Sequence, residues 1–229
     1  MAQRMGKALL TVLREGESGL DAVAGEAGLR SQRRARLFRF FCLHPVAVVA
    51  EAARATDMAV GTLRWHGAKL VETGWLELRG STYYPRGLVD AADLPILEAL
   101  GAVAARRTLA SVFEIPGQSV SELGHAVGLT RQATARFVDD LRSVGLVSAV
   151  EDGAFVRVYA TRLLAGRRED SGDRVRAFCN DVLRRLHTEG LAREVLRRTS
   201  SEFLLRYGLP GRRVVLNLPI DPFSSALLE

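Results

Sequence analysis

An internal repeat with a spacing of 71 residues constrains this 229-residue chain more than any other feature of its sequence. In each copy, an apolar helical pattern ends at a proline and is followed by a short helix, a turn, a longer helix and a glycine. Alternating polar and apolar residues follow each glycine and predict a β-hairpin. Identical residues are in register between the copies: Pro45 with Pro116, Glu51 with Glu122, Leu70 with Leu141, and Gly74 with Gly145.

Each copy predicts a winged helix, in which a short helix packs against a longer one and a hairpin covers the open edge of their apolar cluster. The expected elements of the first copy are helices over residues 36–41, 46–54 and 59–73 and a hairpin over 75–86. Those of the second copy are a helix ending at Ile115, helices over 120–127 and 130–144, and strands over 146–150 and 155–159. We therefore expect a mostly α fold with small β-wings: two tandem winged helix-turn-helix domains plus a C-terminal helical segment.

The helical period separates a buried face from an accessible face on each long helix. The residues expected to face the core are Leu63, Gly67, Leu70 and Val71 in the first copy, and Thr134, Phe137, Val138 and Leu141 in the second. The residues left accessible are Thr62, Arg64, Trp65 and Lys69 in the first copy, and Arg131, Gln132 and Arg136 in the second. Thr130 is the expected N-cap of the second long helix.

Residues 59–76, Ala-Val-Gly-Thr-Leu-Arg-Trp-His-Gly-Ala-Lys-Leu-Val-Glu-Thr-Gly-Trp-Leu, resemble the recognition helix and first wing strand of winged helix-turn-helix transcription regulators, especially the archaeal kind with two such domains in one chain. Residues 129–147, Leu-Thr-Arg-Gln-Ala-Thr-Ala-Arg-Phe-Val-Asp-Asp-Leu-Arg-Ser-Val-Gly-Leu-Val, are similar to the same element. The resemblance covers about residues 33–162 and implies sequence-specific binding of double-stranded DNA in the major groove. Glu151 and Asp152 depart from the pattern, because they put negative charge on the second wing.

Winged-helix pairs of this kind also serve as protein-interaction modules in chromosome-organising and polymerase-associated complexes. That alternative function stays open at this point.

Formal charge favours the first copy as the DNA reader. Residues 31–90 carry nine cations and five anions, whereas residues 91–165 carry seven and eight. Arg64, Lys69, Arg79 and Arg86 are therefore expected to contact phosphates and bases, the alternative being a solvated basic face. Arginine and glutamine suit guanine and adenine edges, so the accessible residues of the second long helix are candidates as well.

Composition divides the chain into four parts. They are an N-terminal helical arm at 1–30, the two winged helices at 31–90 and 91–165, and a C-terminal segment at 166–229. One long helix, with Asp93 as its cap, is expected to join the winged helices. The C-terminal segment is expected to hold a helix with an apolar stripe, a second helix over Leu191, Val195 and Leu196, and a short strand near residues 212–219. The stripe favours a homodimer, the alternative being packing on its own chain.

Several further expectations concern single residues. Trp65 is expected to pack against the core, and His66 to be structural. Strand alternation predicts that one of Tyr83 and Tyr84 faces the core and the other faces solvent. The arginines of residues 33–39 are candidates for phosphate contact, and residues 22–41 resemble a third helix-turn-helix weakly.

Several classes of protein are excluded or disfavoured. No apolar run reaches the 18 or so residues that cross a bilayer, and the N-terminus lacks the apolar region of a signal peptide, so a cytoplasmic, nucleoid-associated protein is expected. The two cysteines and four histidines lack metal-ligand spacing, and the common phosphate-binding and nucleophile motifs do not occur. We therefore expect no enzyme activity, no metal and no cofactor. The sequence leaves the operator and any small-molecule effector undetermined.

Overall fold

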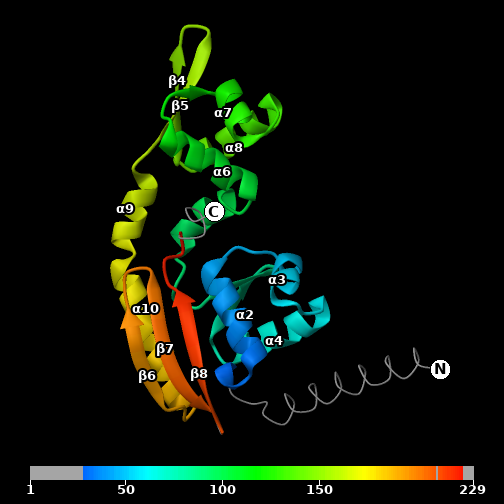
Figure 1. Ribbon diagram of the computed structural model, residues 1–229, viewed down its shortest axis with the longest axis vertical. Helices are drawn as coiled ribbons and strands as arrows, with labels where there is room; N and C mark the ends of the chain where they lie inside the picture. Colours follow the sequence, from blue (N-terminus) through cyan, green and yellow to red (C-terminus); the bar gives the residue numbers. More distant parts are fainter. Residues whose placement is uncertain (1–27, 210, 224–229) are drawn as a thin grey trace, which may run out of the picture.

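The computed structural model describes residues 28–209 and 211–223 and forms two hydrophobic cores, one above the other in Figure 1. The fold mixes helices with three small antiparallel sheets. Almost all of the expected N-terminal arm lies outside the described residues, as do residues 22–27 of the weak third helix-turn-helix, whose remaining residues lie in the 3₁₀ turn and the first helix described below. The described part of the arm, Gly28–Arg30, forms the 3₁₀ turn η1.

Two segments repeat the same order of elements at the spacing found in the sequence. The first segment contains α2 (Gln32–Leu43), α3 (Val49–Thr56), α4 (Val60–Glu72), β1 (Leu76–Arg79) and β2 (Thr82–Pro85). The second contains α6 (Val103–Glu114), β3 (Gln118–Ser119), α7 (Val120–Val127), α8 (Arg131–Ser143), β4 (Val147–Asp152) and β5 (Phe155–Ala160). Both bounds of each of the three helices in the first segment recur 71 residues later.

The turns of the two segments share a backbone conformation that explains the residues in them. Gly74 and Gly145, which end the long helices, have φ angles of 76° and 77°, a left-handed conformation that glycine adopts without strain. Asp57 and Gly128 both take the left-handed conformation after the short helix. The caps differ, because Ser119 and Glu122 form a capping box at α7 whereas Val48 offers no side-chain cap to α3.

The expected single helix between the two segments is wrong. The chain forms η2 (Ala91–Asp93) and α5 (Leu94–Ala99), breaks, and only then begins α6. The break is stabilised by Arg106, whose Nη1 donates to the carbonyl oxygens of Leu100 at 3.1 Å and Gly101 at 3.0 Å. These hydrogen bonds satisfy carbonyl groups that a continuous helix would have used itself.

The C-terminal segment is not wholly helical, which corrects the expectation for residues 166–229. It contains α9 (Leu163–Asp170) and α10 (Gly172–Thr188), followed by an antiparallel sheet of β6 (Arg193–Arg198), β7 (Glu202–Leu209) and β8 (Arg212–Pro219). The helix expected over Leu191–Leu196 is wrong, because Gly190 ends the helical region with a φ of 70° and the following residues pair with β7. The strand expected near residues 212–219 is confirmed as β8.

The apolar stripe of α10 is buried within its own chain. Val175, Phe178, Val182 and Leu186 are each at most 6% exposed and belong to one core with α2, β7 and β8. The rings of Phe178 and Phe38 lie 6.3 Å apart. The stripe therefore needs no second copy to cover it, and the reason for predicting a dimer through it is removed.

Tyr83 and Tyr84 are both buried, each at 5% exposure, so the expected solvent-facing tyrosine is wrong. The two side chains do point to opposite faces of the hairpin, as strand alternation requires. Tyr83 enters the core of the first segment, where its ring lies 5.5 Å from that of Phe41, and Tyr84 enters the core of the second segment. Strand β2 is covered on both faces because its two tyrosines enter different cores.

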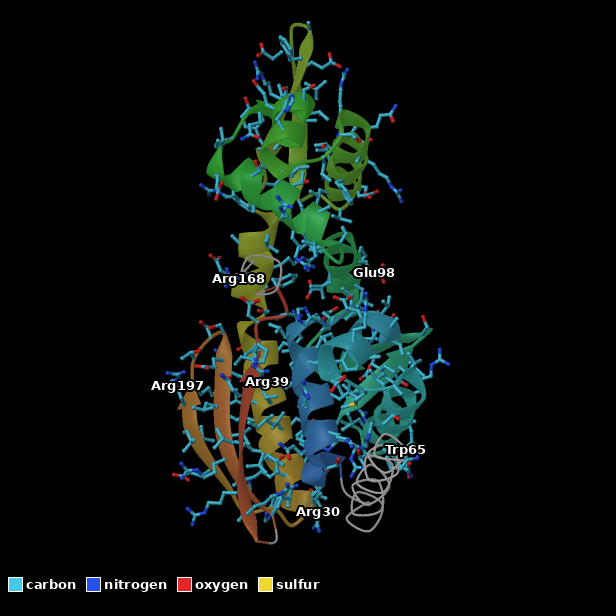
Figure 2. The ribbon with its side chains drawn as sticks, turned by 45° about the vertical axis from the view of Figure 1, so that its right-hand side comes forward. Arg30, Arg39, Trp65, Glu98, Arg168 and Arg197 are labelled. Atoms are coloured by element: carbon cyan, nitrogen blue, oxygen red, sulfur yellow. The ribbon has the colours of Figure 1, made fainter. Side chains whose placement is uncertain are left out.

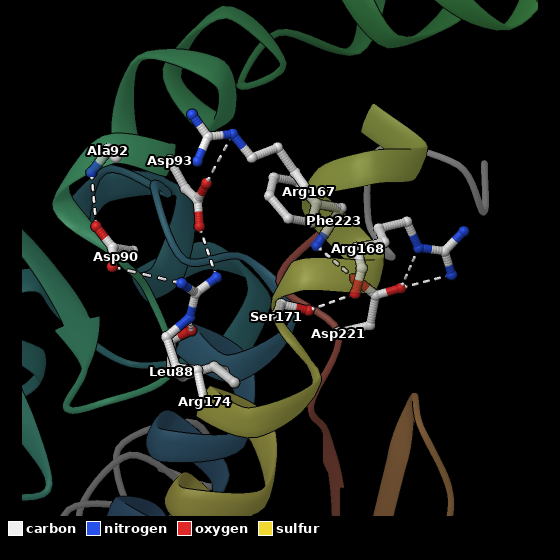
Figure 3. A network of polar contacts seen from close by, with 10 residues as sticks. All are labelled: Leu88, Asp90, Ala92, Asp93, Arg167, Arg168, Ser171, Arg174, Asp221 and Phe223. Atoms are coloured by element: carbon white, nitrogen blue, oxygen red, sulfur yellow. Dashed lines mark hydrogen bonds and ion pairs between the residues drawn. The ribbon is translucent and has the colours of Figure 1, made fainter. Parts of the chain in front are cut away.

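Charged groups join the two parts of the molecule where α9 meets α10 (Figure 3). Asp93 is 1% exposed and accepts from Arg174 Nη2 at 2.6 Å, while Arg174 Nε donates to the carbonyl oxygen of Leu88 at 3.2 Å. Asp221 pairs with Arg168 at 2.7 Å in the same region. The network connects the loop before α5, the α9–α10 joint and the residues after β8.

Replacing Asp93 with Asn is expected to lower the free energy of unfolding by about 2 kcal/mol, because Arg174 loses a charge-assisted bond to a buried carboxylate. The control is Asp173→Asn, which removes an 87% exposed carboxylate paired with Arg176. It should change the same free energy by less than about 0.5 kcal/mol. Urea denaturation followed by circular dichroism measures both, and equal losses would contradict a structural role for Asp93.

Replacing Phe178 with Ala is expected to lower the free energy of unfolding by about 3–5 kcal/mol, because a large ring leaves a packed core. The loss should not depend on protein concentration, since the contacts lie within one chain. Val215→Ala, at a side chain that is 56% exposed, is the control and should cost less than about 1 kcal/mol. If the unfolding midpoint of the wild type rose with protein concentration while that of Phe178→Ala did not, the prediction of a dimer through α10 would be supported again.

Candidate nucleic-acid interface

The second long helix, α8, presents a polar face at its N-terminal half. Arg131, Gln132 and Arg136 are exposed, and Thr130 caps the helix by accepting from the backbone N–H of Ala133 at 3.3 Å. Neither Arg131 nor Arg136 forms an ion pair with a carboxylate in the described part of the chain. The face therefore offers guanidinium and amide donors that no internal partner occupies.

The first long helix, α4, presents a different face at the equivalent positions. Val60 and Gly61 stand where α8 has Arg131 and Gln132, and Trp65 stands where α8 has Arg136. Val60 is 42% exposed and Trp65 is 47% exposed. This face is more apolar than that of α8 and offers fewer side chains able to read base edges.

Trp65 is exposed rather than packed in the core, which corrects the expectation made for it. Its ring contacts that of His66 edge-on with the centroids 4.8 Å apart, and Figure 2 shows it on the side of α4 away from the C-terminal sheet. His66 is 2% exposed, in agreement with a structural role. The helix turns Trp65 outward because Leu63, His66 and Leu70 take the inward positions.

Three of the basic residues expected to read DNA in the first segment are engaged by nearby glutamates. Lys69 Nζ lies 2.8 Å from Glu72 Oε2, and Arg79 Nη2 lies 3.0 Å from Glu77 Oε2. Arg86 Nε lies 3.7 Å from the other oxygen of Glu77. Such exposed pairs are weak and can be exchanged for a phosphate, but each reduces the net positive potential that the cation contributes.

Two other residues on the first segment complete the predicted set. Arg64 is exposed on α4 and has no carboxylate partner among the described residues, and Thr62 is half-buried on the same helix. The structure thus gathers Thr62, Arg64, Trp65 and Lys69 on α4 and puts Arg79 and Arg86 on the adjoining hairpin. The predicted residues of α8 lie on the other part of the molecule (Figure 1).

The second wing carries an internal ion-pair network instead of free cations. Arg157 Nη1 lies 3.1 Å from Glu122 Oε2, and Arg157 Nε lies 3.2 Å from Asp152 Oδ2. Hydrogen bonds from the backbone and side chain of Ser119 lower the pKa of Glu122, and Arg157 lowers it further, so this carboxylate stays charged. Phosphate contact from this wing would have to displace these carboxylates.

Two of the arginines of residues 33–39 form hydrogen bonds within the fold. Arg34 is 1% exposed and its Nε donates to the carbonyl oxygen of Gly28 at 2.7 Å. Arg39 Nε donates to the carbonyl oxygen of Asn217 on β8 at 2.9 Å. These contacts attach α2 to η1 and to the sheet, so Arg34 is unavailable to phosphate.

Other kinds of site are not evident in the described part of the chain. Cys42 and Cys179 are buried free thiols, and burial raises the pKa of both. No group of three or more histidine, cysteine, aspartate or glutamate side chains there could hold a metal ion. No helix among the described residues is both long enough and apolar enough to cross a membrane.

No family model and no curated protein matches the chain. Among solved structures, it is similar to the multiple antibiotic-resistance repressor MarR from Listeria monocytogenes, at 19% identity over 43% of this chain and 67% of that chain, with a TM-score of 0.27. BpsR from Bordetella bronchiseptica, whose DNA binding is regulated by 6-hydroxynicotinic acid, is 13% identical over 55% of this chain and 80% of its own, with a TM-score of 0.29. ScpB from Mycobacterium tuberculosis is 21% identical over 58% of this chain and 92% of its own, with a TM-score of 0.24. Likenesses this low assign no function to the chain.

The two tryptophans are expected to differ in their access to solvent, since Trp65 is 47% exposed and Trp75 is 1% exposed. Trp75→Phe leaves Trp65 as the emitter, and its fluorescence should be quenched efficiently by iodide. Trp65→Phe leaves Trp75, which should resist quenching and emit at shorter wavelength. Similar quenching in both variants, with both folded by circular dichroism, would contradict the exposed position of Trp65.

Proposed function

We propose that this protein is a transcription regulator with two tandem winged-helix units that binds double-stranded DNA, and that α8 is the main reading helix. The recurrence of three helices at a spacing of 71 residues, each set followed by a hairpin, supports the two units. An α-helix of this kind fits the major groove of B-form DNA, where base edges differ in their donors and acceptors. The proposal includes no catalytic step and no cofactor.

The observation that carries the proposal is the free polar face of α8. Arg131 and Gln132 occupy the first turn, Arg136 lies one turn after Gln132, and no described carboxylate pairs with either arginine. Arginine suits the O6 and N7 atoms of guanine, and glutamine suits the N6 and N7 atoms of adenine. Although the first segment has the higher formal charge, ion pairs with glutamates reduce the positive charge that it offers to DNA.

The face of α4 favours a second use. Val60 and Trp65 are exposed there, and an exposed tryptophan is a side chain enriched in protein interfaces. A protein-interaction module is therefore the second candidate function. A two-fold dimer through the α10 stripe is not part of the proposal, because that stripe is buried within the chain.

Binding of the full chain to a duplex DNA pool is expected to weaken steeply with salt, with about −0.9 in the slope of log K against log salt for each phosphate neutralised. Replacing Arg131 and Arg136 together with Ala should weaken binding by at least about tenfold, because each removes a base or phosphate contact. The matched variant replaces Arg64 and Lys69 with Ala and should lose less. Fluorescence anisotropy at several salt concentrations measures both.

The outcomes separate the two candidate functions. A larger loss in the Arg64 and Lys69 variant, with both variants folded, would assign the reading helix to α4. Absence of binding to any duplex at low salt would overturn the DNA-binding proposal and leave the protein-interaction module. Enrichment of one sequence from a random duplex pool would show sequence-specific readout.

A further inference from the structure

A hollow of about 530 Å³ lies between α2 and the C-terminal sheet, away from both long helices of the winged units. Its wall is formed by the second half of α2, the β6–β7 turn and the end of β8. Figure 2 labels the two arginines of this region, Arg39 on α2 and Arg197 on the sheet. The residues that line the hollow are Arg39, Leu43, Arg197, Thr199, Ser201, Glu202, Asn217 and Pro219.

Several hydrogen-bond donors of the hollow are uncommitted. Arg39 uses its Nε for the carbonyl oxygen of Asn217, which holds the guanidinium at the rim, but its two Nη groups have no partner among the described residues. Arg197 is joined to Glu202 through Nη2 alone. The Ser201 hydroxyl likewise has no described partner, whereas the Thr199 hydroxyl is used within the turn, where it accepts from the backbone N–H of Glu202 at 2.9 Å.

The single carboxylate of the hollow limits its charge. Glu202 is held by Arg197 and also accepts from Asn217 Nδ2 at 2.6 Å, so its position is fixed. Two guanidinium groups against one carboxylate leave the hollow with a positive charge. Glu202 therefore competes with any anion for Arg197, and removing its charge should favour such an anion.

The donors line one open space from three elements, α2, β6 and the β6–β7 turn, which suits a ligand group with several acceptor oxygens. A phosphate offers such oxygens in a tetrahedral arrangement, and arginine binds phosphate through paired N–H groups. Leu43 and Pro219 add apolar lining, and the volume lies in the usual range for small-molecule pockets. We infer that this hollow binds a phosphate monoester of a small organic molecule, with Arg39, Arg197 and Ser201 around the phosphate.

Isothermal titration calorimetry on the full chain tests the site, with phenyl phosphate as the probe, inorganic phosphate as the smaller anion, and phenol as the neutral control. Phenyl phosphate should bind more tightly than inorganic phosphate, because its ring reaches the apolar lining, and phenol should not bind. Arg39→Gln and Arg197→Gln should each weaken phenyl phosphate about tenfold, as expected for the loss of a charge-assisted hydrogen bond. Glu202→Gln should strengthen it several-fold, since the competing charge is removed while the acceptor for Asn217 remains.

Arg54→Gln, at an exposed arginine on α3, is the charge-matched control and should leave phenyl phosphate affinity unchanged. Ser201→Ala keeps the test valid if Arg39→Gln disturbs the contact between α2 and β8, and it should weaken binding without changing the unfolding temperature. Equal affinity in wild type, Arg197→Gln and Glu202→Gln would overturn the inference. A short DNA duplex that loses affinity in Arg39→Gln and Arg197→Gln, with no binding of phenyl phosphate, would also overturn it and assign the hollow to the DNA backbone.

Discussion

Burial of one face of α10 against α2 is the constraint on which the rest of this structure depends. Phe178, Val182 and Leu186 complete a core that also contains Phe38 and Leu37 of α2. Strands β7 and β8 cover the same core through Phe203, Leu205 and Leu216, so the C-terminal segment is an integral part of the first segment's core. The Asp93–Arg174 pair then attaches α10 to the turn before α5, which leads into the second segment.

The sequence predicts the elements of this fold correctly where either the helical period or the strand alternation of apolar residues is clear. The long helices and their terminal glycines follow from the repeat, because Gly74 and Gly145 satisfy the same backbone requirement. Strand β6 could not be recognised, since all six of its residues are exposed and the apolar alternation that identifies a strand is missing. Tyr84 could not be placed either, because the core that covers it belongs to the other unit.

The candidate interface illustrates why formal charge is a poor guide to local potential. The first segment carries the excess of cations, yet Lys69, Arg79 and Arg86 each lie beside a glutamate. The second segment is formally negative, but two of its acids lie on the wing, where Arg157 pairs with Asp152. Which cations are left over depends on side-chain positions that a count of charges does not contain. The contrast between Arg131 and Val60 at equivalent helix positions can be seen in the aligned repeat, and our proposal for α8 uses it.

The two cores are formed by different parts of the chain, and this affects the order in which they can fold during synthesis on the ribosome. The core of the second unit uses residues 84–164 together with Phe223, whereas that of the first unit needs residues 29–88 and also residues 175–220. The part of the chain that emerges first is thus completed late, and most of the second unit can fold before it. Until residues 175–220 have been synthesised, the part of α2 that they cover in the folded protein has no partner. A nascent chain of this protein therefore presents a binding surface to chaperones for longer than its winged-helix topology alone would require.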